Sequence, residues 1–239
     1  MLIRVVDLET CGFEPPAGIC EIGFCDLVQG EEGGWIVGSP ANLLVDPGHP
    51  IPPETSAVHH IVDEDVRGAP DFTEAARAVF FDEERFQAPR VVLVAHNARF
   101  ERQWLTPEVT GAADWICTYK VALRLWPDAP AHNNGTLRYW LKPAGLRWHR
   151  ADPAHRAGPD AYVTAFILRE ALAKATIDQM VAWTAEPALL IRCGFGKHRG
   201  VLWRDVPTDY LRWCSGQQMD EDVAFTVRSE MRRRAEGGR

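Results

Sequence analysis

The stretch Val91-Val92-Leu93-Val94-Ala95-His96-Asn97-Ala98-Arg99-Phe100-Glu101 decides the fold class. Its first five residues form a continuous apolar run, which is typical of a strand buried on both faces in a parallel part of a sheet. Asn97 is a good N-cap, so we expect a helix that begins at Ala98 and carries Glu101 in or just past its first turn. The stretch predicts a strand–turn–helix unit of an α/β protein.

The surrounding sequence predicts a mixed sheet that is assembled around this unit. Before it, alternating apolar residues and glycine turns indicate strands, and a helix is expected to start at Asp71. After it we expect a further strand, two helices, a long loop and a strong helix from Asp160 to about Ala175. The expected strands are 2–6, 18–28, 34–45 and 114–118, the short helices 54–59, 119–126 and 136–141, and the loop 143–159. Strands followed by alternating strands and helices predict an α/β domain over 1–176 and a small, mostly helical appendage over 177–239.

The net charge of −7 does not by itself suggest nucleic-acid binding, but the distribution of charge is uneven. Residues 1–131 carry 9 basic and 21 acidic side chains, whereas residues 132–160 carry 5 and 2, and residues 191–239 carry 10 and 7. An acidic body with local basic segments suits an enzyme that grips a short stretch of polyanion.

The cysteines and the N-terminus indicate a cytoplasmic protein. None of the six cysteines forms a C-x-x-C pair, and we expect reduced thiols; they are Cys11, Cys20, Cys25, Cys117, Cys193 and Cys214. Arg4, Asp7 and Glu9 interrupt any signal-peptide core, and no apolar stretch reaches the roughly 20 residues that span a bilayer, so no membrane partner is expected.

Asp7 and Glu9 lie two residues apart at the end of the first expected strand, so their side chains share one face. Hard carboxylate oxygens in that arrangement suit Mg²⁺ or Mn²⁺. Two acids beside a buried strand are costly unless something neutralises them, which favours a metal site over a solvated pair.

His155 and Asp160 belong to the long loop and to the start of the helix after it. We expect the helix to hold the Asp160 carboxylate toward a site and the loop to bring the His155 imidazole over it, where it can deprotonate a water molecule. The alternative for Asp160 is a simple helix cap, and the alternative for Glu101 is a surface glutamate.

Taken together and in this order, the three pieces resemble the motifs of the DEDDh, or DnaQ-like, 3′–5′ exonucleases. The family patterns Asp-x-Glu-Thr-x-Gly, His-Asn-Ala-x-Phe-Asp and His-x-Ala-x-x-Asp correspond to residues 7–12, 96–101 and 155–160. Segments that resemble exonuclease X-type proteins in particular are 57–61, 115–118, 125–127, 195–197 and 210–213. The chain departs from the family at Glu101, where the family has aspartate.

The resemblance implies a ribonuclease H-like mixed β-sheet flanked by helices, a two-metal site and a set of substrate contacts. Asp7, Glu9, Glu101 and Asp160 would bind two divalent cations, Mg²⁺ or Mn²⁺, and His155 would take a proton from the attacking water. The implied substrate-binding residues are Thr10, Cys11 and Gly12, whose amides would hold a 3′-OH, Phe13, which would stack on the last base, and His59 and Asn97 beside the site. A core aromatic is the alternative for Phe13, and a purely structural role is the alternative for His96 and Asn97.

The implied function is a metal-dependent 3′–5′ exodeoxyribonuclease that acts on single-stranded DNA or DNA 3′ ends, releases nucleoside 5′-monophosphates and serves DNA repair. Because the motifs do not read the 2′-OH, a 3′–5′ exoribonuclease stays open. A polymerase proofreading subunit is a further alternative. The extra methylene of Glu101 also leaves open a catalytically silent protein that binds 3′ ends.

Two basic segments outside the motifs are candidate nucleic-acid contacts. The first precedes His155 and contains Arg138, Lys142, Arg147, Arg150 and Arg156 with Trp140 and Trp148, a composition that suits phosphate contacts and base stacking. The second is the appendage, with Lys197, His198, Arg199 and the run Arg232 to Arg234. For both segments a solvated or packing role is the alternative.

Overall fold

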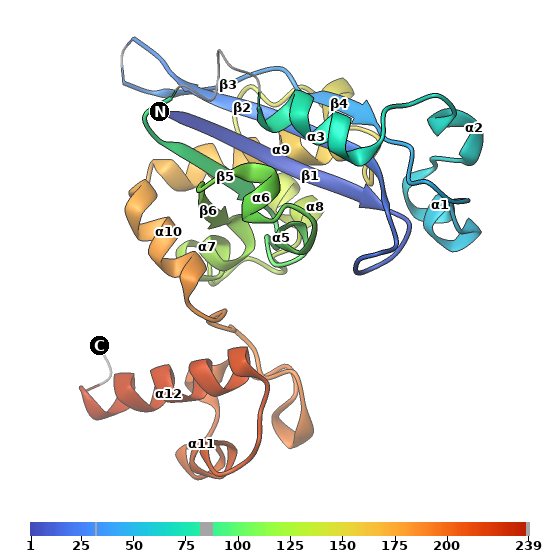
Figure 1. Ribbon diagram of the computed structural model, residues 1–239. Coiled ribbons are helices and arrows are strands. Elements are labelled where there is room, and N and C mark those ends of the chain that lie inside the picture. Colours follow the sequence, from blue (N-terminus) through green and yellow to red (C-terminus); the bar gives the residue numbers. More distant parts are fainter. Residues whose placement is uncertain (32, 82–87, 238–239) are drawn as a thin grey trace.

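The computed structural model describes residues 1–31, 33–81 and 88–237, and within them the strands form one mixed sheet (Figure 1). The sheet order is β3-β2-β1-β5-β6, and β4 pairs with another part of β2. Strand β1 is antiparallel to β2 and parallel to β5, which is parallel to β6. The strands are β1 (Leu2–Thr10), β2 (Ile19–Gln29), β3 (Trp35–Val37), β4 (Ala41–Leu44), β5 (Val91–Ala95) and β6 (Asp114–Cys117).

The apolar run 91–95 is β5, and its parallel pairing on both sides confirms the expected buried parallel strand. Strand β1 extends past Asp7 to Thr10 because its pairing with β2 continues to a register shift between Glu9 and Thr10. The expected single strand 34–45 is instead two strands, since Gly38, Ser39 and Pro40 interrupt it.

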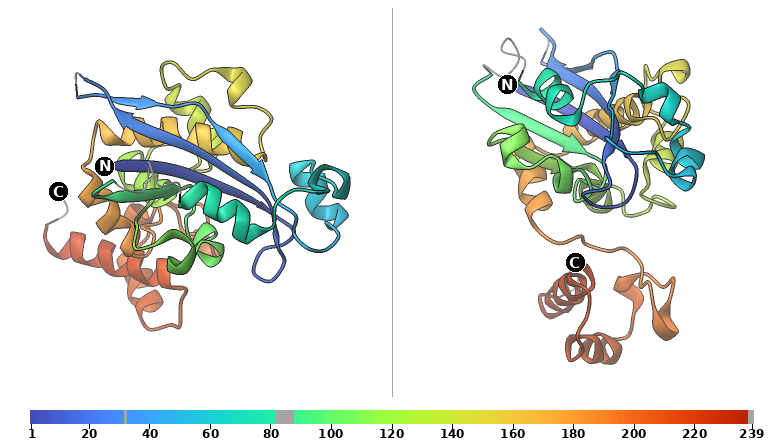
Figure 2. Two further views of the ribbon diagram at one scale, coloured as in Figure 1. Left: turned by 45° about the horizontal axis from the view of Figure 1, so that its top comes forward. Right: turned by 45° about the vertical axis from the view of Figure 1, so that its right-hand side comes forward.

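Helices cover both faces of the sheet and bury two apolar clusters. One cluster joins Ile3 and Val5 to α9, and the other joins Val6 and Leu8 to α3 (Figures 1 and 2). The helices are α1 (Pro53–His59), α2 (Asp63–Val66), α3 (Phe72–Phe80), α5 (Glu101–Trp104), α6 (Pro107–Thr110), α7 (Thr118–Leu125), α8 (Asn134–Leu141), α9 (Ala157–Leu172), α10 (Ile177–Ala185), α11 (Thr208–Ser215) and α12 (Glu221–Ala235), with 3-10 turns η1 (Trp148–Arg150), η2 (Gly196–His198) and η3 (Trp203–Asp205).

Two helix starts differ from the sequence-based expectation. Asn97 does not cap a helix at Ala98: it adopts a left-handed backbone conformation with φ of 69°, in a turn, and α5 begins only at Glu101. Helix α9 begins at Ala157, so Asp160 is its fourth residue rather than its cap. The start at Asp71 is confirmed, since its carboxylate accepts from the Glu74 amide.

The C-terminal part has an apolar cluster of its own, built around Trp203, Leu211 and Val227, and it stands apart from the sheet in Figure 1. Helix α10, which follows residue 176, packs instead on the core beside β6 and α7 through Met180. The division at residue 176 stays a prediction. In the part of the chain that the structure describes, no helix is both long enough and apolar enough to cross a membrane.

Candidate active site

Strand β1 changes from an apolar to an acidic strand on one of its faces. Ile3 and Val5 point into the cluster beneath α9, and the same alternation carries Asp7 and Glu9 onto that face. Because α9 crosses this face, its N-terminal turn brings Asp160 to the two strand carboxylates. The site therefore results from the two-residue alternation of side chains along β1 and from the position of the first turn of α9.

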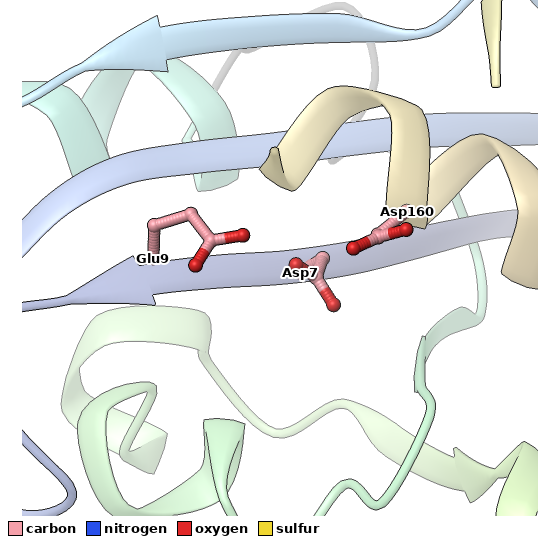
Figure 3. A group of neighbouring side chains, drawn as sticks. All are labelled: Asp7, Glu9 and Asp160. Atoms are coloured by element: carbon pink, nitrogen blue, oxygen red, sulfur yellow. The ribbon is translucent and has the colours of Figure 1, made fainter. Parts of the chain in front are cut away.

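Asp7, Glu9 and Asp160 offer carboxylate oxygens that all lie within 4.8 Å of one another. Figure 3 shows the three side chains converging, two from β1 and one from α9. All three are only partly exposed. The fold brings together these three residues, which the sequence had assigned to one site. Three converging carboxylates require either a neutralising cation or bound protons.

Burial and mutual repulsion shift the three carboxyl groups toward their protonated forms. Burial raises the pKa of Asp7 well above its ordinary value, and the charges of Asp160, Glu101 and Glu9 raise it further. Burial and the charge of Asp160 raise the pKa of Glu9 to about 8. Burial also raises the pKa of Asp160. A divalent cation would reverse these shifts, because it stabilises the ionised carboxylates.

Glu101 lies beside this group but outside the tight cluster of three oxygens. It is the first residue of α5, only 3% exposed, and its Oε2 is buried without a hydrogen-bond partner. Burial raises its pKa to about 8, with a smaller contribution from Glu9. A surface role is therefore wrong. A buried, unsatisfied carboxylate oxygen facing other carboxylates fits a position next to a divalent cation.

His155 is tied to the cluster by its backbone. Its amide donates to Asp160 Oδ2 at 2.9 Å, its φ is 59°, and its side chain is exposed in the loop before α9. The backbone of His155 is therefore held at the acidic group, while its imidazole is open to solvent.

The sequence analysis missed Glu21, which anchors the start of α9 to the sheet. Glu21 lies opposite Glu9 in the β1–β2 register and is fully buried. Its carboxylate accepts from Asn42 Nδ2 at 3.0 Å, from Arg156 Nε at 3.0 Å and from the Ala157 amide at 2.9 Å. The available signal was a glutamate within the apolar run from Ile19 to Cys25, which requires buried partners. Arg156 is consequently a structural residue rather than a free phosphate contact.

Gly23 permits this close contact between helix and sheet. A Cβ at Gly23 would come within 2.0 Å of the Ala157 backbone, so only glycine allows α9 to lie this near to β2. The position of Asp160 thus depends on Gly23, Glu21 and Arg156 together.

The loop after β1 presents Phe13 to solvent. Phe13 is 90% exposed, so the core alternative is wrong and a ring face is available for a base. Gly12 packs so tightly that a Cβ would lie 2.7 Å from Ala17 Cβ, and its carbonyl accepts from Thr10 Oγ1. The Cys11 amide already donates to the Gly18 carbonyl, so it is committed within the fold.

The remaining histidines of the motifs are packed within the protein. His59 is buried, its Nδ1 accepts from the Ile61 amide, and its Nε2 lies 3.7 Å from Cys20 Sγ. His96 Nδ1 and Nε2 contact Thr118 Oγ1 and the His132 carbonyl, and burial lowers its pKa to about 4. The structural role expected for His96 agrees with these contacts. All six cysteines are buried and unpaired by disulfides.

Three carboxylates that converge between a strand and a helix of a mixed sheet suit a metal-dependent hydrolase, and comparison with known proteins identifies the family. Residues 5–168 match the family model described as "Exonuclease". The chain belongs to this exonuclease family, whose members depend on divalent metal ions, and it is an exonuclease with the DnaQ-like fold expected from its motifs.

The similarity to one curated relative covers nearly the whole chain. Exodeoxyribonuclease 10 of Escherichia coli strain K12 is 34% identical over 234 residues, which is 95% of this chain and 97% of the relative. A solved structure of exonuclease X in complex with 5′-overhanging duplex DNA is 33% identical, with a TM-score of 0.59, and covers 77% of this chain and 99% of its own. E. coli exonuclease I in complex with a dA16 oligonucleotide shares the fold alone, with 17% identity, a TM-score of 0.53 and coverage of 76% and 42%.

Proposed function

We propose that this protein is a metal-dependent 3′–5′ exodeoxyribonuclease that releases nucleoside 5′-monophosphates from single-stranded DNA or DNA 3′ ends. The observation that carries the proposal is the convergence of the Asp7, Glu9 and Asp160 oxygens within 4.8 Å beside the unsatisfied oxygen of Glu101. The relative over the full chain is named an exodeoxyribonuclease, which favours DNA over RNA. A cytoplasmic role in DNA repair agrees with this assignment.

Asp7, Glu9, Asp160 and Glu101 would hold two divalent cations, Mg²⁺ or Mn²⁺. When bound, such ions lower the pKa of a water molecule and neutralise charge on the phosphodiester. The chain's own part is to bring three carboxylates together, with the Glu101 carboxylate beside them, and to keep them there by burial.

His155 supplies the base of the proposed reaction. Its exposed imidazole would accept a proton from the attacking water, whose oxygen forms a bond to phosphorus while the bond from phosphorus to the 3′ oxygen breaks. The departing 3′ oxygen takes up a proton, which leaves a shortened strand with a 3′-OH and one nucleoside 5′-monophosphate. The amide of His155 donates to Asp160 Oδ2, which ties the backbone of the base to a carboxylate of the cluster.

Substrate contacts would lie along the loop after β1. Phe13 would stack on the terminal base, which suits its 90% exposure. The amide of Gly12 would approach the terminal 3′-OH with Thr10 fixing the loop. Cys11 and His59, which are buried, and Asn97, which is exposed, would border the bound strand.

The test is a cleavage assay with 5′-labelled single-stranded DNA and RNA of matched sequence. Each strand is incubated with Mg²⁺, Mn²⁺ or a chelator and with wild-type protein, Asp7→Ala or Glu101→Asp. The proposal predicts a metal-dependent ladder that shortens DNA from the 3′ end and is lost in Asp7→Ala.

Two other outcomes would change the assignment. Preferential shortening of RNA would make the protein an exoribonuclease. No ladder with the wild type but a ladder with Glu101→Asp would mean that the extra methylene silences the site, and a 3′-end-binding role would then replace the catalytic one.

A further inference from the structure

Two exposed aromatic rings lie together next to the active site and are not explained by the fold. Tyr139 on α8 is 58% exposed and Trp148 on η1 is 55% exposed, and their ring centroids are 5.3 Å apart. We call this pair the aromatic platform. Large aromatic rings are normally buried, so a pair left in solvent at stacking distance indicates a binding surface.

The buried guanidinium of Arg138 packs against both rings of the aromatic platform. It lies 4.3 Å from the Trp148 ring centroid and 5.3 Å from that of Tyr139. The side chain is 6% exposed, and it donates to the Ala151 carbonyl at 2.9 Å and to Asp152 Oδ1 at 3.0 Å. Because Arg138 is held at both contacts, the rings above it are preorganised and lose little freedom when a ligand binds.

The segment that carries most of the platform is positively charged. Between Asp128 and Asp152 the sequence contains four cations, Arg138, Lys142, Arg147 and Arg150, and no Asp or Glu. Lys142 and Arg147 are exposed, whereas Arg138 is committed to Asp152 and Arg150 donates to Ser39 Oγ. A basic segment with two exposed cations, on a chain whose first 131 residues are strongly acidic, fits a polyanion.

The platform borders the acidic cluster. Asp152, which binds Arg138, precedes His155 by three residues. Asn134, the first residue of α8, donates from its Nδ2 to the Asp160 carbonyl at 3.2 Å, so the helix that carries Tyr139 begins at the acidic cluster. A strand whose 3′ end reaches Asp160 can therefore pass over the rings.

We propose that Tyr139 and Trp148 stack against unpaired bases of the DNA strand upstream of its 3′ terminal nucleotide, with Lys142 and Arg147 on the adjacent phosphates. This inference rests on the proposed function and adds a second binding site to it. A single strand is the occupant that fits, because ring faces require unpaired bases and the cations require phosphates. A duplex would offer phosphates without free base faces.

The test is a binding measurement on the full chain in the Asp7→Asn background, which separates binding from cleavage. Fluorescein-labelled DNA single strands of 3, 6, 10 and 20 nucleotides are titrated against the parent, Trp148→Leu, Trp148→Phe, Tyr139→Ala and Arg147→Ala, the last over a series of salt concentrations. Ile36→Ala is the control, since Ile36 is 56% exposed on β3, outside the platform. Thermal melts of every variant report whether the fold is kept.

The expected result is a length-dependent loss of affinity. Trp148→Leu and Tyr139→Ala should each raise Kd for the 20-mer at least about fivefold and for the trimer far less, since base stacking on an aromatic ring is lost. Trp148→Phe should restore most of the affinity, and Arg147→Ala should lower the slope of log K against log salt by about one.

Either of two results would overturn the inference: unchanged 20-mer affinity in Trp148→Leu, or an equal loss for trimer and 20-mer, which would indicate general damage. A failure of the proposed function can be distinguished from a failure of this inference. If the wild-type chain leaves DNA uncut, the proposed function is refuted, whereas the binding data still show whether the aromatic platform contacts the strand.

Discussion

Replacing Glu21 by glutamine tests whether the anchor of α9 sets the geometry of the active site. The carboxylate is fully buried and holds Arg156 and the Ala157 amide. Breaking a buried ion pair costs about 3–5 kcal/mol. The Arg156 side chain is 29% exposed and can recover part of its hydration, so the lower end, about 3 kcal/mol, applies to Glu21→Gln. For a chain of this size that loss corresponds to a fall in Tm of about 6–12 °C.

The same substitution should reduce catalysis beyond its effect on stability. Asp160 lies in the helix turn that Glu21 anchors, and a misplacement of about 1 Å in an active site costs about a hundredfold in rate. We expect kcat in saturating Mn²⁺ to fall roughly 10- to 100-fold, measured well below the Tm of the variant.

Asp26→Asn is the matched control for this prediction. Asp26 lies on the same strand but pairs with the buried Arg4 at 2.7 Å, on the face away from α9. The Asp26→Asn substitution should lower Tm about as much as Glu21→Gln does and should leave kcat near the wild-type value. An equal fall of kcat in both variants, or an unchanged kcat in Glu21→Gln, would refute the positional role of Glu21.

Three further predictions concern the substrate loop, the acidic cluster and the C-terminal part. Phe13→Ala should leave Tm within about 2 °C, because the ring is exposed, and should weaken binding of DNA 3′ ends about fivefold or more in a titration of the Asp7→Asn background. Metal-free protein should lose stability as pH rises from about 4.5 to 8, since Glu9 and Glu101 have ordinary pKa values of 4.5 and folded values of about 8, and the unfolded chain therefore releases protons first. Calorimetry should consequently show a larger rise of Tm with Mg²⁺ at pH 8 than at pH 6, and an equal rise would contradict the assigned ligands. Arg234→Ala should loosen α11 and α12 while the sheet keeps its protection in hydrogen exchange, because Arg234 binds Glu230 and the Val206 carbonyl.

Local sequence patterns predicted the central strands of the sheet and the pairing of Asp7 with Glu9 on one face. The apolar run at 91–95 specified a doubly buried strand, because only such a strand is apolar on both faces. The spacing of Asp7 and Glu9 specified a shared face, because the period of a strand is two. Both inferences depend on neighbours in the sequence and needed no tertiary contact.

Features that depend on distant contacts could not be inferred. The turn of Asn97 delays the helix to Glu101, and the clamp between Glu21 and Arg156 starts α9 earlier than its apolar pattern suggests. The run Arg232 to Arg234 looked free for phosphates, yet Arg233 and Arg234 both pair with Glu230. Pairings such as Glu21 with Arg156 join residues far apart in sequence, which no local pattern encodes.

The most direct test of the account is the binding of Mn²⁺ to metal-free protein, followed by electron paramagnetic resonance in wild type and Asp7→Asn. We expect two bound ions in the wild type at pH 8 and the loss of this binding in the variant, because Asp7 is one of the three converging carboxylates and is close to Glu101 as well. Undiminished Mn²⁺ binding by Asp7→Asn would place the metal elsewhere and contradict the assigned active site.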